Sequence, residues 1–325
     1  MSGQLWSVDS LGGYMHSVNL SRELRMAVTP ALRFRQFCDI KDPDQQQRHK
    51  GATFHWNVYS TLTADSGSTS RVLTETSTMP SGKYTITQGT LTIAEYGIEA
   101  PYTGVLDDLS EHPVKEIIHK VLKDDCKKAL DIAAAQEFEK TPLRVVPTTG
   151  TDTAAVTLTT NSVATLTNNV ALGTKHVKSI IDIMKERNIP AYTDDDYYSL
   201  AWPTTYRSFK DDLESVNQYT ETGYGKIMRG EIGRYENCRF TEQTNVLKTD
   251  MSTAAAAWTN GKSNWAFFFG SDTVAEAVAI PEEIRGKLPG DYGRDKGVAY
   301  YYLGGFGICH TDQAQARIVM WDSAA

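Results

Sequence analysis

The sequence predicts an α+β fold in which strands and helices occupy separate stretches of the chain. A Thr-, Ile- and Tyr-rich run from Lys83 to Glu99 has the composition of a strand. An amphipathic pattern from about Pro113 to Thr141 predicts one helix that is long for an ordinary domain. From residue 263 onward the chain is again rich in strand-forming residues. This succession of ribbon, rod, mixed region and strands favours the α+β class.

Composition bounds the possible functions. The 325 residues are 40% hydrophobic and 22% charged, which suits one large or two moderate folded domains. A net charge of -7 argues against a protein that grips nucleic acid, because such binding needs clustered Lys and Arg. The longest apolar runs, such as Trp265 to Phe269, are too short to cross a bilayer, and the start "MSGQLWSVDS" has no signal-peptide pattern.

The first fifty residues read as an arm. Glycines and prolines interrupt them, although a short helix around Ser21 to Val28 fits the pattern. "LRFRQFCDI" alternates arginine with aromatic or apolar residues, which predicts an extended segment lying on another surface. The chain has four cysteines, dispersed and without a CxxC pair, which indicates buried thiols of a reducing compartment.

The next segment predicts a strand out, a polar tip and a strand back. "GATFHWNVYSTL" supplies β-forming Phe54, Trp56, Val58 and Tyr59, and "TADSGSTS" follows as a flexible stretch before the Lys83 to Glu99 strand. This excursion has too little apolar content for a core of its own. Because an isolated two-stranded ribbon is marginally stable, we expect it to pack against a partner.

The long helix is expected to begin after "DDLSEHP", with Ser110 as its cap and Pro113 in its first turn. Its apolar stripe consists of Val114, Ile117, Ile118, Val121, Leu122, Cys126, Ala129, Leu130 and Ala133. At about 1.5 Å per residue the helix would be roughly 40 Å long, a rod that spans a domain.

The remainder predicts a mixed region. Thr148 to Asn169 reads as a hairpin or surface loop. "TKHVKSIIDIMKERNIP" predicts a helix that buries Val177, Ile180, Ile181 and Met184, and "WPTTYRSFKDDLESV" predicts another with Pro203 in its first turn. "GEIGRYENCRFTEQTNV" reads as a strand and turn.

The candidate chemical sites are weak. Glu116 and His119 have the E-x-x-H spacing of di-iron bundles, but the sequence holds only one such motif, so both are read as helix-face residues. Asp194 to Asp196 lack the spacing and closing Glu of a calcium loop and read as a solvated acidic turn. "GGFGICH" lacks the G-K-[ST] of a phosphate loop, and its glycines are expected to allow close strand packing. We therefore expect no catalytic, cofactor or metal site and no enzyme.

Taken in order, several segments resemble the major capsid proteins of tailed bacteriophages with the HK97 fold, and among them the group typified by phage N4. They are "LRFRQFCDI", "HKGATFHWNVYSTL", "RVLTETSTMPSG", "YTITQGTLTIAEYGIEAPYTGVLDDLSEHPV" and "GEIGRYENCRFTEQTNV", and they cover roughly half of the chain. None of them is a catalytic motif, so the specificity of the resemblance lies in their succession.

The resemblance implies a division of the chain. Residues 1–50 would form an N-terminal arm, 51–98 an extended loop (E-loop), 99–141 a peripheral domain with the spine helix and 142–262 an axial domain. Residues 263–325 would be a strand-rich part that completes the peripheral and axial domains.

The resemblance also implies a function. The protein would assemble with itself, as pentamers and hexamers, into the icosahedral shell around the DNA genome of a tailed phage. Further partners would be a separate scaffolding protein, a portal protein, a decoration protein and packaged DNA, the last bound only non-specifically, with no membrane. The protein would lie in the virion capsid, and in the host bacterial cytoplasm during assembly.

Aromatic anchoring singles out Tyr84, Tyr96 and Tyr102 as candidate contacts between subunits. Two alternatives stay open at this point. One is a soluble metal-dependent enzyme with an acidic site, built from Asp194 to Asp196 or from Glu116 and His119. The other is a different virion structural protein, such as a decoration or tube protein.

Overall fold

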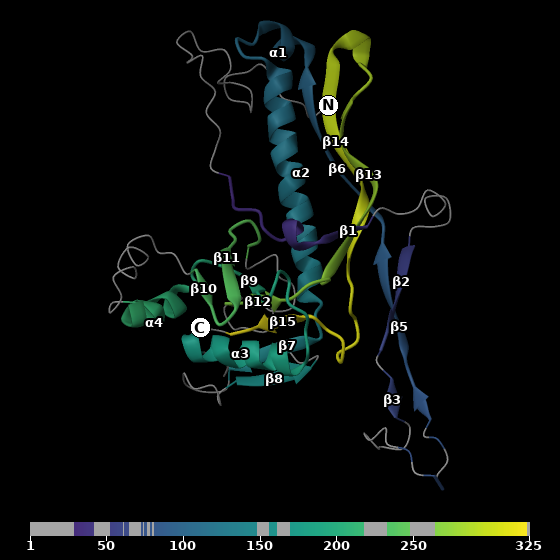
Figure 1. Cartoon of the computed structure of the whole chain (residues 1–325). Helices are drawn as coiled ribbons and strands as arrows, with labels where there is room; N and C mark the ends of the chain where they lie inside the picture. The colour runs from purple at the N-terminus through teal and green to yellow at the C-terminus, as the bar shows by residue number, and fades with distance from the viewer. Residues whose placement is uncertain are drawn as a thin grey trace.

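The fold consists of two sheets, a long helix and a projecting ribbon (Figure 1). The computed structural model describes residues 29–41, 53–60, 62–64, 73, 75–76, 79, 81–147, 156–160, 170–217, 233–247 and 264–323. The expected helix at Ser21 to Val28 lies outside these residues, as does most of the segment Thr148 to Asn169.

A four-stranded sheet supports the upper half of the molecule in Figure 1. Its strands in spatial order are β1 (Asp39–Lys41), β13 (Val274–Gly286), β14 (Asp295–Ile308) and β6 (Ala94–Thr103). β13 and β14 form a long antiparallel hairpin, and the 3-10 turn η5 (Asp291–Gly293) lies between them. After β6 come α1 (Gly104–Leu109) and α2 (Val114–Glu139), and α2 packs along β13 and β14.

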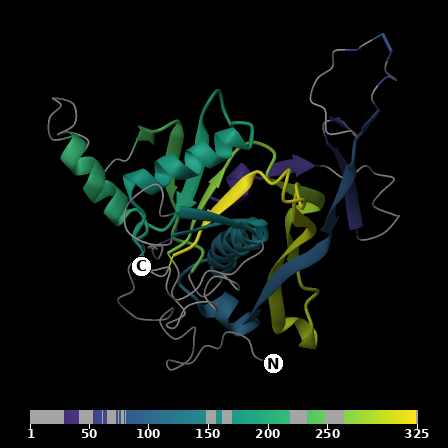
Figure 2. The same cartoon turned by 90° about the horizontal axis from the view of Figure 1, so that it is seen from below.

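A seven-stranded mixed sheet forms the second half. Its strands in spatial order are β10 (Arg234–Tyr235), β11 (Cys238–Glu242), β9 (Tyr197–Ala201), β12 (Ala266–Phe269), β15 (Ile318–Trp321), β7 (Leu143–Pro147) and β8 (Val156–Thr160). Alternate residues of β12 face opposite sides, as the pleat requires. Phe267 and Phe269 pack in the core that includes α2, whereas Phe268 packs in the core with α3 (Thr174–Glu186) and α4 (Arg207–Asn217). The sheet is thus a layer between α2 and the α3–α4 pair (Figure 2).

The long helix is confirmed, with a different start and a different buried face from those expected. Ser110 lies at the C-terminal end of α1, an unexpected short helix, and Pro113 precedes the first residue of α2. Ser110 Oγ instead accepts the backbone N–H of His112 in the link between the helices. Val121, expected in the apolar stripe, is 58% exposed, because the buried line runs through Leu122, Cys126 and Leu130 and continues beyond them.

In the mixed region the structure agrees with the prediction from the sequence except at the start of one helix. α3 buries Val177, Ile180, Ile181 and Met184 as expected. α4 begins at Arg207, later than expected, and Pro203 lies in the turn before it. In that turn Tyr206 is fully buried and its hydroxyl lies 2.7 Å from Ser199 Oγ, so tertiary packing fixes a turn where propensity alone would allow helix. The strand and turn expected over "GEIGRYENCRFTEQTNV" are confirmed in its described part as β10 and β11.

Residues 31–41, here called the inner strap, join the two sheets. Phe34 packs against Phe138, Trp265 and Phe267 with ring centroids 5.5 to 6.0 Å apart. The strap was expected to be extended throughout, but it forms the 3-10 turn η2 (Arg35–Phe37) before it pairs in parallel with β13 as β1. The turn lets Phe34 and Phe37 both enter the core.

All four cysteines are free and buried, as the sequence predicted. Among the helices in the described part of the chain, none combines the length and apolar character needed to cross a bilayer.

Candidate assembly surfaces

The ribbon projects from the body next to the lower end of the four-stranded sheet (Figure 1). β2 (Thr53–Tyr59) pairs antiparallel with β5 (Ile86–Thr92), so that Thr53 lies opposite Thr92 and Tyr59 opposite Ile86. Farther out, β3 (Thr63–Ala64) pairs with β4 (Gly82–Lys83). The strand out and strand back that the sequence predicted are therefore present.

The two faces of the ribbon differ in burial. Along β2 the residues alternate between exposed and half-buried, and along β5 Gly89 and Leu91 are buried. The half-buried face lies on β14, while the opposite face and the outer part are open.

Large apolar side chains are exposed on the outer ribbon. They are Tyr59, Leu62, Leu73, Met79, Tyr84 and Ile86, each more than half exposed. Such a concentration is unusual on a monomer surface and is typical of a surface that another chain covers.

A second group of exposed apolar residues lies at the far end of the β13–β14 hairpin. Ile284, Leu288 and Tyr292 are exposed there, and Val105 and Leu109 of α1 are exposed nearby. The backbone N–H of Gly104 donates to the carbonyl of Arg294 (2.9 Å), which ties α1 to the hairpin end. The two groups lie at opposite ends of the molecule (Figure 1).

The three tyrosines selected from the sequence have different environments. Tyr84 is 63% exposed on the outer ribbon. Tyr96 is half-buried on β6, with its ring 5.9 Å from that of Tyr302. Tyr102 is 3% exposed and packs inside its own chain. We therefore carry the hypothesis of an inter-subunit contact forward for Tyr84 and Tyr96 and not for Tyr102.

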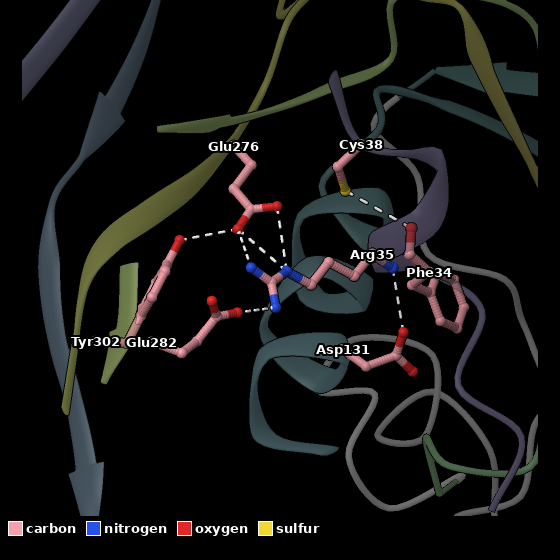
Figure 3. A network of polar contacts seen from close by, with 7 residues as sticks. All are labelled: Phe34, Arg35, Cys38, Asp131, Glu276, Glu282 and Tyr302. Atoms are coloured by element: carbon pink, nitrogen blue, oxygen red, sulfur yellow. Dashed lines mark hydrogen bonds and ion pairs between the residues drawn. The ribbon is translucent and has the colours of Figure 1, made fainter. Parts of the chain in front are cut away.

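A partly buried charge network holds the inner strap in place (Figure 3). Arg35 Nη2 and Nε donate to Glu276 Oε1 at 2.7 and 3.1 Å, and Tyr302 Oη donates to the same oxygen at 2.9 Å. Arg35 Nη1 also pairs with Glu282. Glu276 is 1% exposed, so its charge is compensated almost entirely by these partners.

The network also reaches α2. Asp131 accepts the backbone N–H of Arg35 and the side-chain amide of Asn245, each at 3.1 Å. Burial raises the pKa of Asp131, although these hydrogen bonds oppose the shift. Burial acts to lower the pKa of Arg35, but hydrogen bonds and charges from Glu276 and Glu282 outweigh it and raise that pKa. Sequence reasoning missed these residues, because their partners are far apart along the chain.

No family model and no curated protein matches the sequence. Solved structures of other proteins do match the fold of this chain. The chain is similar to the capsid of cyanophage P-SCSP1u, with TM-score 0.67 and 11% identity over 94% of this chain and 92% of the other. It is also similar to the acid-stable capsid of Helicobacter pylori bacteriophage KHP30 (TM-score 0.65, 11% identity, 94% and 95% covered) and to the capsid of Ralstonia phage GP4 (TM-score 0.63, 12% identity, 98% of both chains).

The chain has an HK97-like capsid fold. The similarity extends over nearly the whole length of each chain. At 11 to 12% identity the similarity establishes the fold alone.

The residues considered as an acidic or metal site are either paired with arginines or exposed in this fold. Asp196, expected in a solvated turn, is 1% exposed and lies 2.6 Å from Arg234 and 2.7 Å from Arg239. It therefore joins β9 to the β10–β11 hairpin. Glu116 and His119 are exposed on α2. Among the described residues, no group of three or more His, Cys, Asp or Glu side chains could hold a metal ion.

The glycines of "GGFGICH" lie in β14, and two of them, Gly305 and Gly307, pack against β5. A Cβ atom on Gly305 would lie 2.3 Å from the carbonyl oxygen of Thr92, and one on Gly307 would lie 3.0 Å from Leu91 Cβ. The expectation that these glycines serve close strand packing is confirmed.

Proposed function

We propose that this protein is the major capsid protein of a tailed phage, of the phage N4 type, and that it assembles into the icosahedral shell around the DNA genome. The observation that carries the proposal is the fold shared with capsid subunits over more than nine-tenths of this chain. The outer ribbon supports it, because its exposed apolar side chains need a cover that the described part of the chain does not supply.

We also propose the functional division of the chain. Residues 1–50 act as the arm, 51–98 as the E-loop, 99–141 as the peripheral domain with the spine helix, and 142–262 as the axial domain. Residues 263–325 complete both domains. In support, β13 and β14 belong to the four-stranded sheet beside α2, whereas β12 and β15 belong to the seven-stranded sheet.

Shell stability then comes from many modest contacts. Each interface contributes several kcal/mol after its ordering costs, and a closed shell adds these contributions. Such ring contacts are heterologous, so the rotation between subunits must close to avoid open filaments. The ribbon meets a neighbour through its apolar outer part, with Tyr84 as a candidate anchor there and Tyr96 as a second candidate contact on β6.

The proposal assigns a structural, non-enzymatic role and a set of partners. These are other copies of the chain in pentamers and hexamers, a separate scaffolding protein, a portal protein and a decoration protein. Packaged DNA is held only non-specifically, which agrees with the net charge of -7. The protein resides in the virion capsid and in the host bacterial cytoplasm during assembly.

Negative-stain electron microscopy tests the proposal. The purified chain is imaged after size-exclusion chromatography, both alone and co-expressed with the scaffolding protein from the same genome. Closed shells, or rings of five and six subunits, are expected. Open tubes would instead assign the chain to a tube protein, and a uniformly small species in both preparations would overturn the capsid proposal.

A further inference from the structure

The inner part of the ribbon contacts β14 through Trp56 and Leu91. Trp56 lies on the half-buried face of β2, directly opposite Gly89 of β5. A Cβ atom on Gly89 would lie 2.2 Å from Trp56 Nε1, so the ring occupies the space that a side chain at position 89 would need. Trp56 Nε1 donates to the carbonyl oxygen of Cys309 at 2.9 Å, which joins the ribbon to the end of β14.

The body offers a surface shaped for this ring. A Cβ atom on Gly307 would lie 3.2 Å from Trp56 Cη2 and 3.0 Å from Leu91 Cβ, and Leu91 itself is 1% exposed. Gly305 gives the same close approach to the backbone of Thr92. We call Gly305 and Gly307 of β14 the glycine notch, since they admit Leu91 and the indole, while Gly89 on the ribbon itself leaves room for the ring.

Beyond the glycine notch, the described residues make few further contacts between the ribbon and the body. β6 pairs with β14 as far as Ala94 opposite Gly304, and one residue, Ile93, separates β6 from β5. A further contact is the hydrogen bond from Thr87 Oγ1 to Gln315 Oε1, 3.1 Å long. Because a two-stranded ribbon is marginal by itself, its direction depends on what holds its base.

We propose that Trp56 is a latch for the whole ribbon. In the docked state the indole fills the notch and fixes the direction in which the ribbon leaves the body. In the released state the ring leaves the notch, and the paired strands swing about Ile93. Close-packed contacts of this kind favour discrete in and out positions over a continuous range. This goes beyond the proposed function, and it concerns the free subunit whether or not shells form.

Spin labels measure the direction of the ribbon. Exposed Gln88 on β5 and exposed Lys120 on α2 are changed to cysteine and labelled, while the four native thiols are buried and do not compete. Double electron–electron resonance on the unassembled subunit then reports the distance between ribbon and helix. The parent protein is expected to show one narrow distance distribution.

Two substitutions should favour the released state, one by changing the indole ring and the other by changing the residue opposite it. Trp56→Ala removes the ring, and Gly89→Ala keeps the ring but fills its place. Both should broaden the distribution or add a second distance. Tyr59→Ala removes an 81% exposed ring from the same strand, and Gly286→Ala adds a methyl where no atom lies within 4 Å. Both matched controls should keep the parent distribution.

A narrow, unchanged distribution in both Trp56→Ala and Gly89→Ala would overturn the latch. Trp56→Phe adds a finer test, since it keeps an aromatic ring and loses the N–H donor to Cys309. Loss of one hydrogen bond should increase the released population by about fivefold. Helical circular dichroism from α2 checks that each variant is folded; should Trp56→Ala be unfolded, Gly89→Ala and Trp56→Phe decide the question.

Discussion

Arg35 shows how one residue can join distant parts of this chain. Its side chain meets Glu276 and Glu282 on β13, and its backbone N–H meets Asp131 on α2. Tyr302 adds a hydrogen bond to the same Glu276 oxygen. Because Glu276 is 1% exposed, its charge depends on these partners.

Removing the cation should therefore cost more than the pair itself contributes. We expect Arg35→Met to lower the free energy of unfolding by about 3 kcal/mol, since it leaves a buried unpaired carboxylate. The double variant Arg35→Met/Glu276→Gln should recover much of the loss. Urea denaturation of the unassembled subunit measures both. The exposed pair of Arg294 and Asp291 is the control, and Arg294→Met should cost less than about 0.5 kcal/mol.

Asp272 gives the protein a specific sensitivity to acid. A hydrogen bond from His310 and the charge of Arg317 lower the pKa of Asp272 from 3.8 to about 2, although burial opposes them. A depressed carboxyl pKa contributes stability that is present above the ordinary value and is lost as the pH falls through the folded-state value. This contribution should therefore fade between pH 3.8 and about pH 2.

The variant Asp272→Asn should remove that part of the pH dependence. Asn tolerates the positive φ of 54° at this position, so the loop conformation is kept. Melting temperatures measured across the acid range should fall less steeply in Asp272→Asn than in the parent. Asp182→Asn, at an exposed site on α3, should leave the slope unchanged, and an equal slope in Asp272→Asn would contradict the assignment.

At the scale of elements, α2 illustrates where helical periodicity loses accuracy. The sequence predicted both Val121 and Leu130 in one apolar stripe, yet Val121 is 58% exposed and Leu130 is fully buried. The helix first packs on β13 and β14 and then reaches the seven-stranded sheet near Phe138. Its neighbours change along its length, so its buried face changes as well.

Paired substitutions on α2 measure this difference. Leu130→Ala should lower the free energy of unfolding by about 2 to 5 kcal/mol, because it opens a cavity between the helix and the sheets. Val121→Ala should stay within about 0.5 kcal/mol of the parent, because the side chain is already in solvent. Chemical denaturation followed by circular dichroism distinguishes them, and equal losses would mean that the face is assigned wrongly.

At the scale of the whole molecule, the outer ribbon lies outside the hydrophobic cores that stabilise the folded subunit. Both core clusters consist of residues of the body, and the ribbon residues beyond Tyr59 and Ile86 belong to neither. Stability of the subunit and formation of a shell should therefore respond differently to changes in the ribbon.

Replacing residues 61–84 with a short Gly-Ser turn should leave the melting temperature of the subunit within a few degrees of the parent, and it should abolish shells and rings in negative-stain images. Ser60 and Thr85, already joined by backbone hydrogen bonding, provide the closing point. Intact shells from the shortened chain would refute the role given to the outer ribbon.

Much of the fold could be predicted because its signals are local. The periodicity of "TKHVKSIIDIMKERNIP" predicted α3 and its buried face, and β-branched and aromatic residues predicted both ribbon strands. The start of α4 was predicted too early, because burial of Tyr206 fixes a turn that local propensity does not encode. Of the candidate contacts, Tyr84 is exposed but Tyr102 is buried, since composition does not reveal which face of a strand is covered.

The sequence by itself determined the elements, their order and the class of the fold, because hydrophobic period, turn residues and strand propensity act over a few neighbouring residues. Only the tertiary structure decided which distant residues meet. It brought Arg35 to Glu276, Asp196 between Arg234 and Arg239, and Trp56 against Gly89 and Gly307. Such contacts depend on how sheets and helices pack in three dimensions, and sequence separation carries no information about them.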